Sequence, residues 1–285
     1  MITFLSSFPN INPGKLEQRF QPEFTGTAKE MEFFKPQTTF YQLEAEKCVK
    51  QHIGIDLFVF ATTYMDIATL GCLTKTTGGQ LFFYPRYSME RDMIKLHNEF
   101  YRVLTRTTGY NGVMRLRASA GIEIVNYYGN HMLTYGTDME VANIDCDKVY
   151  SVTVRNEGAI QENTNIGVQC AMLYTTSLGE RRIRVHSLQI PVSKDYGNIF
   201  GSADLETVTY LLTTKSIKRA LTTVLADVRK QVITDVIQIV YGFRKYASKK
   251  SFEHRILVIP EGLKLLPLYI ICLHKNILLK SGRVR

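Results

Sequence analysis

The sequence predicts a chain of three modules: an α/β layer at residues 1–107, an antiparallel β-sandwich at 108–200 and an α-helical region at 201–285. Three observations lead to this prediction. Strands alternate with helices in the first third, apolar residues recur every second position in the second third, and they recur every three or four positions in the last third. With 285 residues, the chain is long enough for each module to have its own core.

The α/β layer is predicted from three short apolar runs with helical segments between them. Strands are expected at residues 2–8, 55–61 and 80–84, and helices at 39–52, 65–76 and 89–106. The run 55–61 is apolar at nearly every position, which is typical of a strand buried on both faces of a parallel sheet. Gly78 and Gly79 should end the second helix. The third helix is expected to turn four apolar side chains inward: Met93, Leu96, Phe100 and Leu104.

Short β-branched runs separated by glycine or asparagine predict the sandwich. Its strands are expected at residues 113–118, 121–128, 149–155, 166–176 and 181–192. Between them lies an acidic stretch that we interpret as a solvated connecting loop, because it lacks the spacing of a calcium loop. Its carboxylates are Asp138, Glu140, Asp145 and Asp147.

The last third is predicted to be helical. Ser202 and Asp204 are residues of the type that cap helices, and an apolar series follows them. A second helix is indicated by apolar residues at three- and four-residue steps from Val224 to Phe243. The most apolar stretch, residues 256–273, contains Pro260, Glu261, Lys264 and Pro267, so it does not predict a membrane-spanning helix.

Composition and motifs argue against an enzyme. The sequence has no Walker loop, no GxGxxG, no GxSxG and no HExxH. The six histidines are isolated, and no two of the five cysteines lie within twenty residues, so neither a zinc site nor a disulfide framework is expected. Basic residues exceed acidic ones by nine, which favours an acidic partner: a peptide, an anionic membrane or a nucleic acid.

Two basic strands are the candidate binding features. Arg115 and Arg117 flank Leu116, and the two-residue period of a strand places both guanidinium groups on one face. A second basic surface is expected where Arg182, Arg184 and His186 alternate with Ile183 and Val185. Guanidinium groups arranged in this way can pair with carboxylates. A merely solvated sheet face would show the same alternation.

Several segments, in order along the whole chain, resemble the cargo-adaptor subunit of the inner layer of coat protein complex II. They are residues 4–11 (FLSSFPNI), 40–48, 54–58 (GIDLF), 64–71 (YMDIATLG), 77–79 (TGG), 83–85 (FYP), 114–117 (MRLR), 173–175 (LYT), 179–186 (GERRIRVH) and 265–269 (LLPLY). The resemblance implies part of a von Willebrand-A-like trunk, a β-sandwich and an incomplete helical domain. It also implies that the family's zinc module and the first half of its trunk would precede Met1, and that a gelsolin-like domain would follow Arg285. No zinc or other cofactor is therefore expected in this chain.

The resemblance also implies a function. The family selects cargo and promotes vesicle budding from the endoplasmic reticulum towards the Golgi. It works as a peripheral coat on the cytosolic face of the membrane, next to a GTPase-activating subunit and an anionic membrane surface. Arg115 and Arg117 match the strand on which the family holds the acidic sorting signals of cargo proteins.

Two other readings are open. The sister subunit, which activates the coat GTPase, has the same architecture and a similar GERR strand. The segments GIDLF and YMDIATL favour the adaptor. A nucleic-acid-binding module would suit the positive charge, but no aromatic ring lies between the arginines of 181–186 for a base to stack on, so no nucleic acid is expected.

Overall fold

The structure is a computed structural model that describes residues 1–19, 21–158, 160–162, 164–247 and 257–280. One of the six histidines, His254, and the first residue of the apolar stretch 256–273 lie outside the described ranges. The chain divides into two compact units. Unit 1 comprises Met1–Phe20, Lys35–Ala159 and Asn165–Ile190, and unit 2 comprises Gln21–Phe34, Ile160–Thr164 and Pro191–Arg285.

Unit 1 begins with a parallel three-stranded sheet, as the sequence predicts. Its strands are β1 (Ile2–Leu5), β2 (Asp56–Ala61) and β3 (Leu81–Pro85), in the order β1-β2-β3. The apolar run of β2 is buried at five of its six positions and lies between the other two strands. Three helices accompany the sheet: α1 (Phe40–Lys50), α2 (Ile67–Thr77) and α3 (Met89–Thr105). The alternation of strands and helices is confirmed.

Helix α2 begins and ends at signals that the sequence carries. At its start, the Asp66 carboxylate accepts a hydrogen bond from the Thr69 backbone N–H at 3.1 Å. At its end, Gly78 has φ 81°, the left-handed conformation that stops a helix. The next residue packs so closely that a Cβ on Gly79 would lie 1.7 Å from the Ile55 carbonyl oxygen. The prediction that Gly78 and Gly79 end this helix is confirmed, and the close approach explains the second glycine.

The predicted inner face of α3 is wrong in part. Met93 and Leu104 are exposed, and α3 contains no buried residue. Its contact with the sheet centres on Phe100, whose ring lies 5.7 Å from that of Phe4 and 5.8 Å from that of Phe58. The helical period identifies the apolar side of α3. It does not show how much of that side the three-stranded sheet covers.

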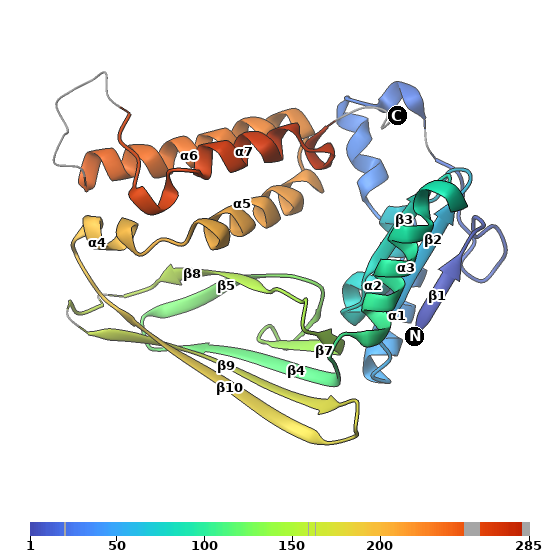
Figure 1. The fold of residues 1–285 in the computed structure, drawn as a ribbon, viewed down its shortest axis with the longest axis horizontal. Helices are drawn as coiled ribbons and strands as arrows, with labels where there is room; N and C mark the ends of the chain where they lie inside the picture. The colour runs from blue at the N-terminus through green and yellow to red at the C-terminus, as the bar shows by residue number, and fades with distance from the viewer. Residues whose placement is uncertain (20, 159, 163, 248–256, 281–285) are drawn as a thin grey trace. The chain divides into compact units, whose positions relative to one another are not determined.

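The second part of unit 1 is an antiparallel sandwich, as predicted (Figure 1). One sheet has the order β10-β9-β4-β7-β6, and the other pairs β5 with β8. The strands are β4 (Thr108–Ala118), β5 (Ile122–Tyr128), β6 (Met132–Thr134), β7 (Asp138–Asp145), β8 (Ser151–Asn156), β9 (Asn165–Thr176) and β10 (Arg181–Pro191). Figure 1 shows β5 and β8 as a layer across from β4 and β9.

The acidic stretch interpreted as a loop is a strand. Residues Asp138–Asp145 form β7, which pairs with both β4 and β6. Met139 and Val141 are fully buried, and they alternate with Asp138 and Glu140. The solvated-loop interpretation was wrong because it weighed the four carboxylates and overlooked the apolar residues at every second position between them.

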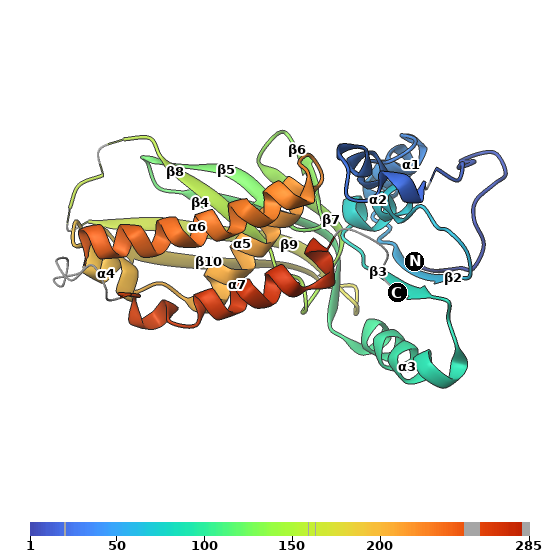
Figure 2. The same ribbon diagram turned by 90° about the horizontal axis from the view of Figure 1, so that it is seen from above.

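Unit 2 is helical, as predicted. It contains α4 (Tyr196–Gly201), α5 (Leu205–Ala220), α6 (Leu225–Tyr246) and α7 (Leu266–Lys275). It also contains four 3-10 helices: η1 (Pro22–Phe24), η2 (Ala28–Phe34), η3 (Glu261–Leu263) and η4 (Ile277–Leu279). Figure 2 shows α5, α6 and α7 side by side. Their shared core is made of Leu212, Val232, Val236, Leu263, Leu266 and Ile270. Asp204 caps α5 by accepting a hydrogen bond from the Thr207 backbone N–H at 2.7 Å.

In the part of the chain that the structure describes, no helix combines the length and the apolar character that crossing a membrane requires.

A candidate anion-binding face of the β-sandwich

Strand β4 places Arg115 and Arg117 two residues apart with exposed side chains. The alternate residues Met114 and Leu116 point to the opposite side, where Met114 is buried against β7. We call the side of β4 that carries the two arginines the outer face and the side that carries Met114 the inner face. The structure therefore brings the two predicted arginines together on one solvent-exposed surface.

Arg115 is paired within the sheet. It lies directly opposite Asp138 of β7, and its Nε and Nη2 groups donate to the two carboxylate oxygens of that residue. The hydrogen bond from Arg115 holds the pKa of the Asp138 carboxyl below its usual value. The same pairing raises the pKa of Arg115, so both groups stay charged. Asp138 is the partner of Arg115 that sequence reasoning missed, because the sequence alone does not show which residue lies opposite Arg115.

Arg117 is placed differently. On β9, the residue opposite Arg117 is the neutral Gln169. On the other side, β7 begins at Asp138, which lies opposite Arg115, so no residue of β7 lies opposite Arg117. Among the described residues, the Arg117 guanidinium makes no hydrogen bond or ion pair. The face thus has one neutralised guanidinium and one that is open to solvent.

The second predicted basic surface lies on the edge strand β10, where every residue is exposed. Two hydrogen bonds fix which residues of β10 share the outer face: Arg181 to the Thr175 hydroxyl at 2.9 Å, and Gln169 to the Ser187 hydroxyl at 3.4 Å. Because Gln169 lies opposite Arg117, the odd-numbered residues of β10 share its face.

Arg182, Arg184 and His186 consequently lie on the inner face, away from Arg115 and Arg117. Arg182 pairs with the nearby Glu180 carboxylate. The odd-numbered positions put Ile183 and Val185 on the outer face instead. The two basic features predicted from sequence are therefore separate surfaces of one sheet.

A buried charge cluster joins the parallel sheet to the sandwich just before β4 begins. Arg106 lies 3.0 Å from the Asp145 carboxylate and donates to the Gln80 side-chain oxygen at 2.8 Å. Lys148 lies 3.5 Å from Asp145 and donates to the Gly79 carbonyl oxygen at 3.3 Å. Burial lowers the pKa of Lys148, and the neighbouring Asp145 carboxylate opposes that effect. The cluster fixes the start of β4, the strand that carries both candidate arginines.

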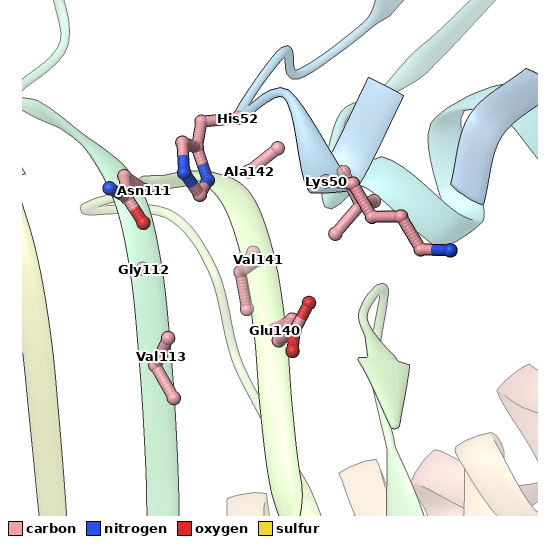
Figure 3. Close-up of a pocket in the computed structure, with 9 residues that line it drawn as sticks. Lys50, His52, Asn111, Gly112, Val113, Glu140, Val141 and Ala142 are labelled. Carbon is pink, nitrogen blue, oxygen red and sulfur yellow. The ribbon is translucent and has the colours of Figure 1, made fainter. Parts of the chain in front are cut away.

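A pocket of about 280 Å³ opens beside this face, at the end of α1 (Figure 3). Its walls include Val113 and Glu140, which lie opposite each other on β4 and β7. Lys50 and His52 contribute from the end of α1 and the turn that follows, and in Figure 3 the Lys50 side chain extends away from the two strands. The pocket is lined by one positive side chain, Lys50, and one negative side chain, Glu140. Its lining is therefore not uniformly positive, unlike the pair Arg115 and Arg117.

The described residues contain no group of three or more His, Cys, Asp or Glu side chains placed to hold a metal ion. The exposed guanidinium groups of the outer face can make charge-assisted hydrogen bonds to an anion.

Comparison with known proteins matches three consecutive domains. Residues 1–104 match the Sec23/Sec24 trunk domain, residues 109–193 the Sec23/Sec24 beta-sandwich domain and residues 204–285 the Sec23/Sec24 helical domain.

Curated relatives include protein transport protein SEC24 A of Arabidopsis thaliana, which is 36% identical over 99% of this chain and 27% of its own length. Human protein transport protein Sec24C is 33% identical over 95% of this chain and 25% of its own length. The crystal structure of the human COPII-coat protein Sec24c superimposes with a TM-score of 0.91 at 32% identity, covering 100% of this chain and 38% of that one. The chain spans about a quarter of the length of these curated relatives. With three consecutive domains of the same family along nearly its whole length, the chain belongs to the Sec23/Sec24 family.

Proposed function

We propose that this chain acts as part of a cargo-selecting subunit of the COPII coat, which promotes vesicle budding from the endoplasmic reticulum towards the Golgi. Its relatives are named protein transport proteins, and the superimposed human Sec24c is named a COPII-coat protein. On this proposal the chain is a binding and scaffolding protein of the cytoplasm, peripheral to the membrane, and not an enzyme. It needs no cofactor of its own.

Within that role, Arg115 and Arg117 hold the acidic sorting signals of cargo proteins. The observation that supports this most is the exposure of both guanidinium groups on one face of the sandwich, in a chain whose domains match the family in order. A guanidinium group suits a carboxylate because its N–H groups can donate two parallel hydrogen bonds to the two oxygens. Arg182, Arg184 and His186 form a second basic surface, separate from the cargo site.

Two further partners belong to the proposal: the GTPase-activating subunit of the same coat and an anionic membrane surface. The formal charge of +9 supports the membrane partner. We expect no nucleic acid, because the exposed arginines of β10 alternate with Ile183 and Val185 and not with aromatic rings. We also propose that the modules divide after residues 107 and 200.

The sister, GTPase-activating subunit is the alternative within the family. The relatives reported above carry Sec24 names, which supports the adaptor. If the chain were the sister subunit, adding it alone to the small coat GTPase should speed GTP hydrolysis; on our proposal it should not.

Peptide binding tests the cargo site. The double variant Arg115→Ala/Arg117→Ala should bind an acidic peptide more weakly than the parent, measured by fluorescence anisotropy. A hydrogen bond to a charged group contributes roughly 1.5–3 kcal/mol, which corresponds to a loss of about tenfold to a hundredfold in affinity.

The matched control is Arg182→Ala/Arg184→Ala, which removes the same two charges from the same sheet but from its inner face. This control should retain parent affinity apart from a small, salt-dependent change. Equal losses in the two double variants would show that the peptide responds to net charge alone, and the proposed site would be wrong.

A further inference from the structure

The Arg115 guanidinium already holds a carboxylate in the way that it would hold a ligand. Its Nε and Nη2 groups donate to the two oxygens of Asp138, which is the side-on, two-bond arrangement expected for an acidic peptide. The Asp138 side chain is 18% exposed, whereas that of Arg115 is 45% exposed. The carboxylate therefore lies deeper than the guanidinium that it neutralises.

The sheet fixes this pairing. Asp138 is directly opposite Arg115 on β7, and its other neighbour is Thr134 on β6. Opposite charges facing each other across an antiparallel pair stabilise the sheet. Because strands on both sides hold the backbone of Asp138, its Cα stays directly opposite that of Arg115 and its carboxylate stays within reach of the guanidinium.

Arg117 has no such counter-ion. Its cross-strand neighbour on β9 is Gln169, and the described residues offer it no hydrogen bond or ion pair. Asp138 does act on it through space, because Arg117 helps to lower the pKa of the Asp138 carboxyl. The three groups together carry one net positive charge, where the two arginines alone would carry two.

We propose that Asp138 is an internal counter-ion that occupies Arg115 in place of a ligand carboxylate and so determines which acidic peptides the outer face accepts. This inference rests on the proposed function of Arg115 and Arg117. A first ligand carboxylate binds Arg117, which is open to solvent. A second one must compete with Asp138 for Arg115, and it meets like-charge repulsion from Asp138 when it approaches. The site consequently gains little from a second acidic residue in the ligand.

The test uses two synthetic peptides of otherwise neutral residues, one with two glutamates separated by one residue and one with the second glutamate replaced by glutamine. Both are titrated into the 285-residue chain and its variants at one fixed ionic strength. In the parent, the two peptides should bind within about threefold of each other. In Asp138→Asn, the two-glutamate peptide should bind about tenfold more tightly than in the parent, because Arg115 becomes available to it.

Asp147→Asn is the matched control. Arg102 donates to both oxygens of Asp147, at 2.9 Å from Nε and 2.6 Å from Nη2, so this variant removes the same charge from the same kind of pair at a different place. It should change the binding of either peptide less than about threefold. If Asp138→Asn tightens the two-glutamate peptide no more than Asp147→Asn does, the inference is overturned.

Two further variants separate the possible failures. Arg117→Ala should weaken the one-glutamate peptide; if it does not, the proposed site and this inference both fall. If Arg117→Ala weakens binding but Asp138→Asn gives no gain, only the role of Asp138 is wrong. Should Asp138→Asn fold poorly by circular dichroism, Arg115→Gln/Asp138→Asn removes the pair together. Its affinity for the one-glutamate peptide should stay within threefold of the parent, and a larger loss would contradict the inference.

Discussion

Replacing Arg106 by Met should lower the free energy of unfolding of the chain by about 3 kcal/mol. The side chains of Arg106 and Asp145 are 3% and 0% exposed, and they lie 3.0 Å apart. Without Arg106, Asp145 is a buried carboxylate that keeps Lys148, 3.5 Å away, and a hydrogen bond from the Asp147 backbone N–H at 3.0 Å. Breaking a buried pair typically costs 3–5 kcal/mol, and we take the lower end because Lys148 remains.

Urea denaturation followed by circular dichroism measures this loss. With a slope of roughly 2–3 kcal/mol per molar urea, the midpoint should fall by about 1–1.5 M. Arg155→Met is the matched control, since it removes the same type of residue from an ion pair with Glu123 in which Arg155 is 61% exposed. An exposed pair of this kind contributes less than about 1 kcal/mol.

A double variant checks the physical cause. Arg106→Met/Asp145→Asn removes both members of the buried pair, so it should recover part of the loss caused by Arg106→Met alone. If Arg106→Met is no more destabilising than Arg155→Met, the charge cluster does not hold the junction between the parallel sheet and the sandwich, and our account of how β4 is positioned is wrong.

Three other predictions follow from the same physical arguments. Val232→Ala should lower the free energy of unfolding by about 2 kcal/mol, because Val232 of α6 is fully buried in the core that α5, α6 and α7 share. A loss below about 0.5 kcal/mol in urea denaturation would contradict that packing. The hydrogen bond from Arg115 lowers the pKa of the Asp138 carboxyl, so this pair stabilises the fold at pH values above the unfolded-state pKa of about 4, and the stabilisation is lost as the pH falls through the lower folded-state pKa. Asp138→Asn should therefore make the free energy of unfolding fall less steeply with decreasing pH in the acid range. An unchanged slope would refute the pairing. Binding to anionic liposomes in a sedimentation assay should collapse between low and high salt if the surplus of nine positive charges drives it, and salt-independent binding would rule that mechanism out.

The order of modules could be predicted from the sequence because each has a different apolar period. The continuous run of β2 and the three- and four-residue stripe of α6 both lie where the pattern placed them. Local signals were equally informative, since Gly78 ends α2 and Asp204 caps α5. These features depend on residues close together in the chain, which the sequence displays directly.

Features that depend on distant segments were harder to predict. The exposure of Met93 depends on the width of a sheet built from three separate strands, and Asp138 meets Arg115 only through the register of β4 with β7. The assignment of Arg182 to the face opposite Arg115 likewise depends on how β10 pairs with β9. Strand register decides the last two of these features, and it is set by pairing across many intervening residues.

Photo-cross-linking of an acidic peptide tests the central claim most directly. A two-glutamate peptide with a photo-reactive group beside the glutamates is bound to the parent chain, irradiated, and its attachment sites are mapped by mass spectrometry. We predict attachment on the outer face, at residues near Arg115 and Arg117 on β4 and at their neighbours on β9, with loss of the product in Arg115→Ala/Arg117→Ala. Attachment confined to the inner face around Arg182 and Arg184, or a product that survives the double replacement, would contradict the account.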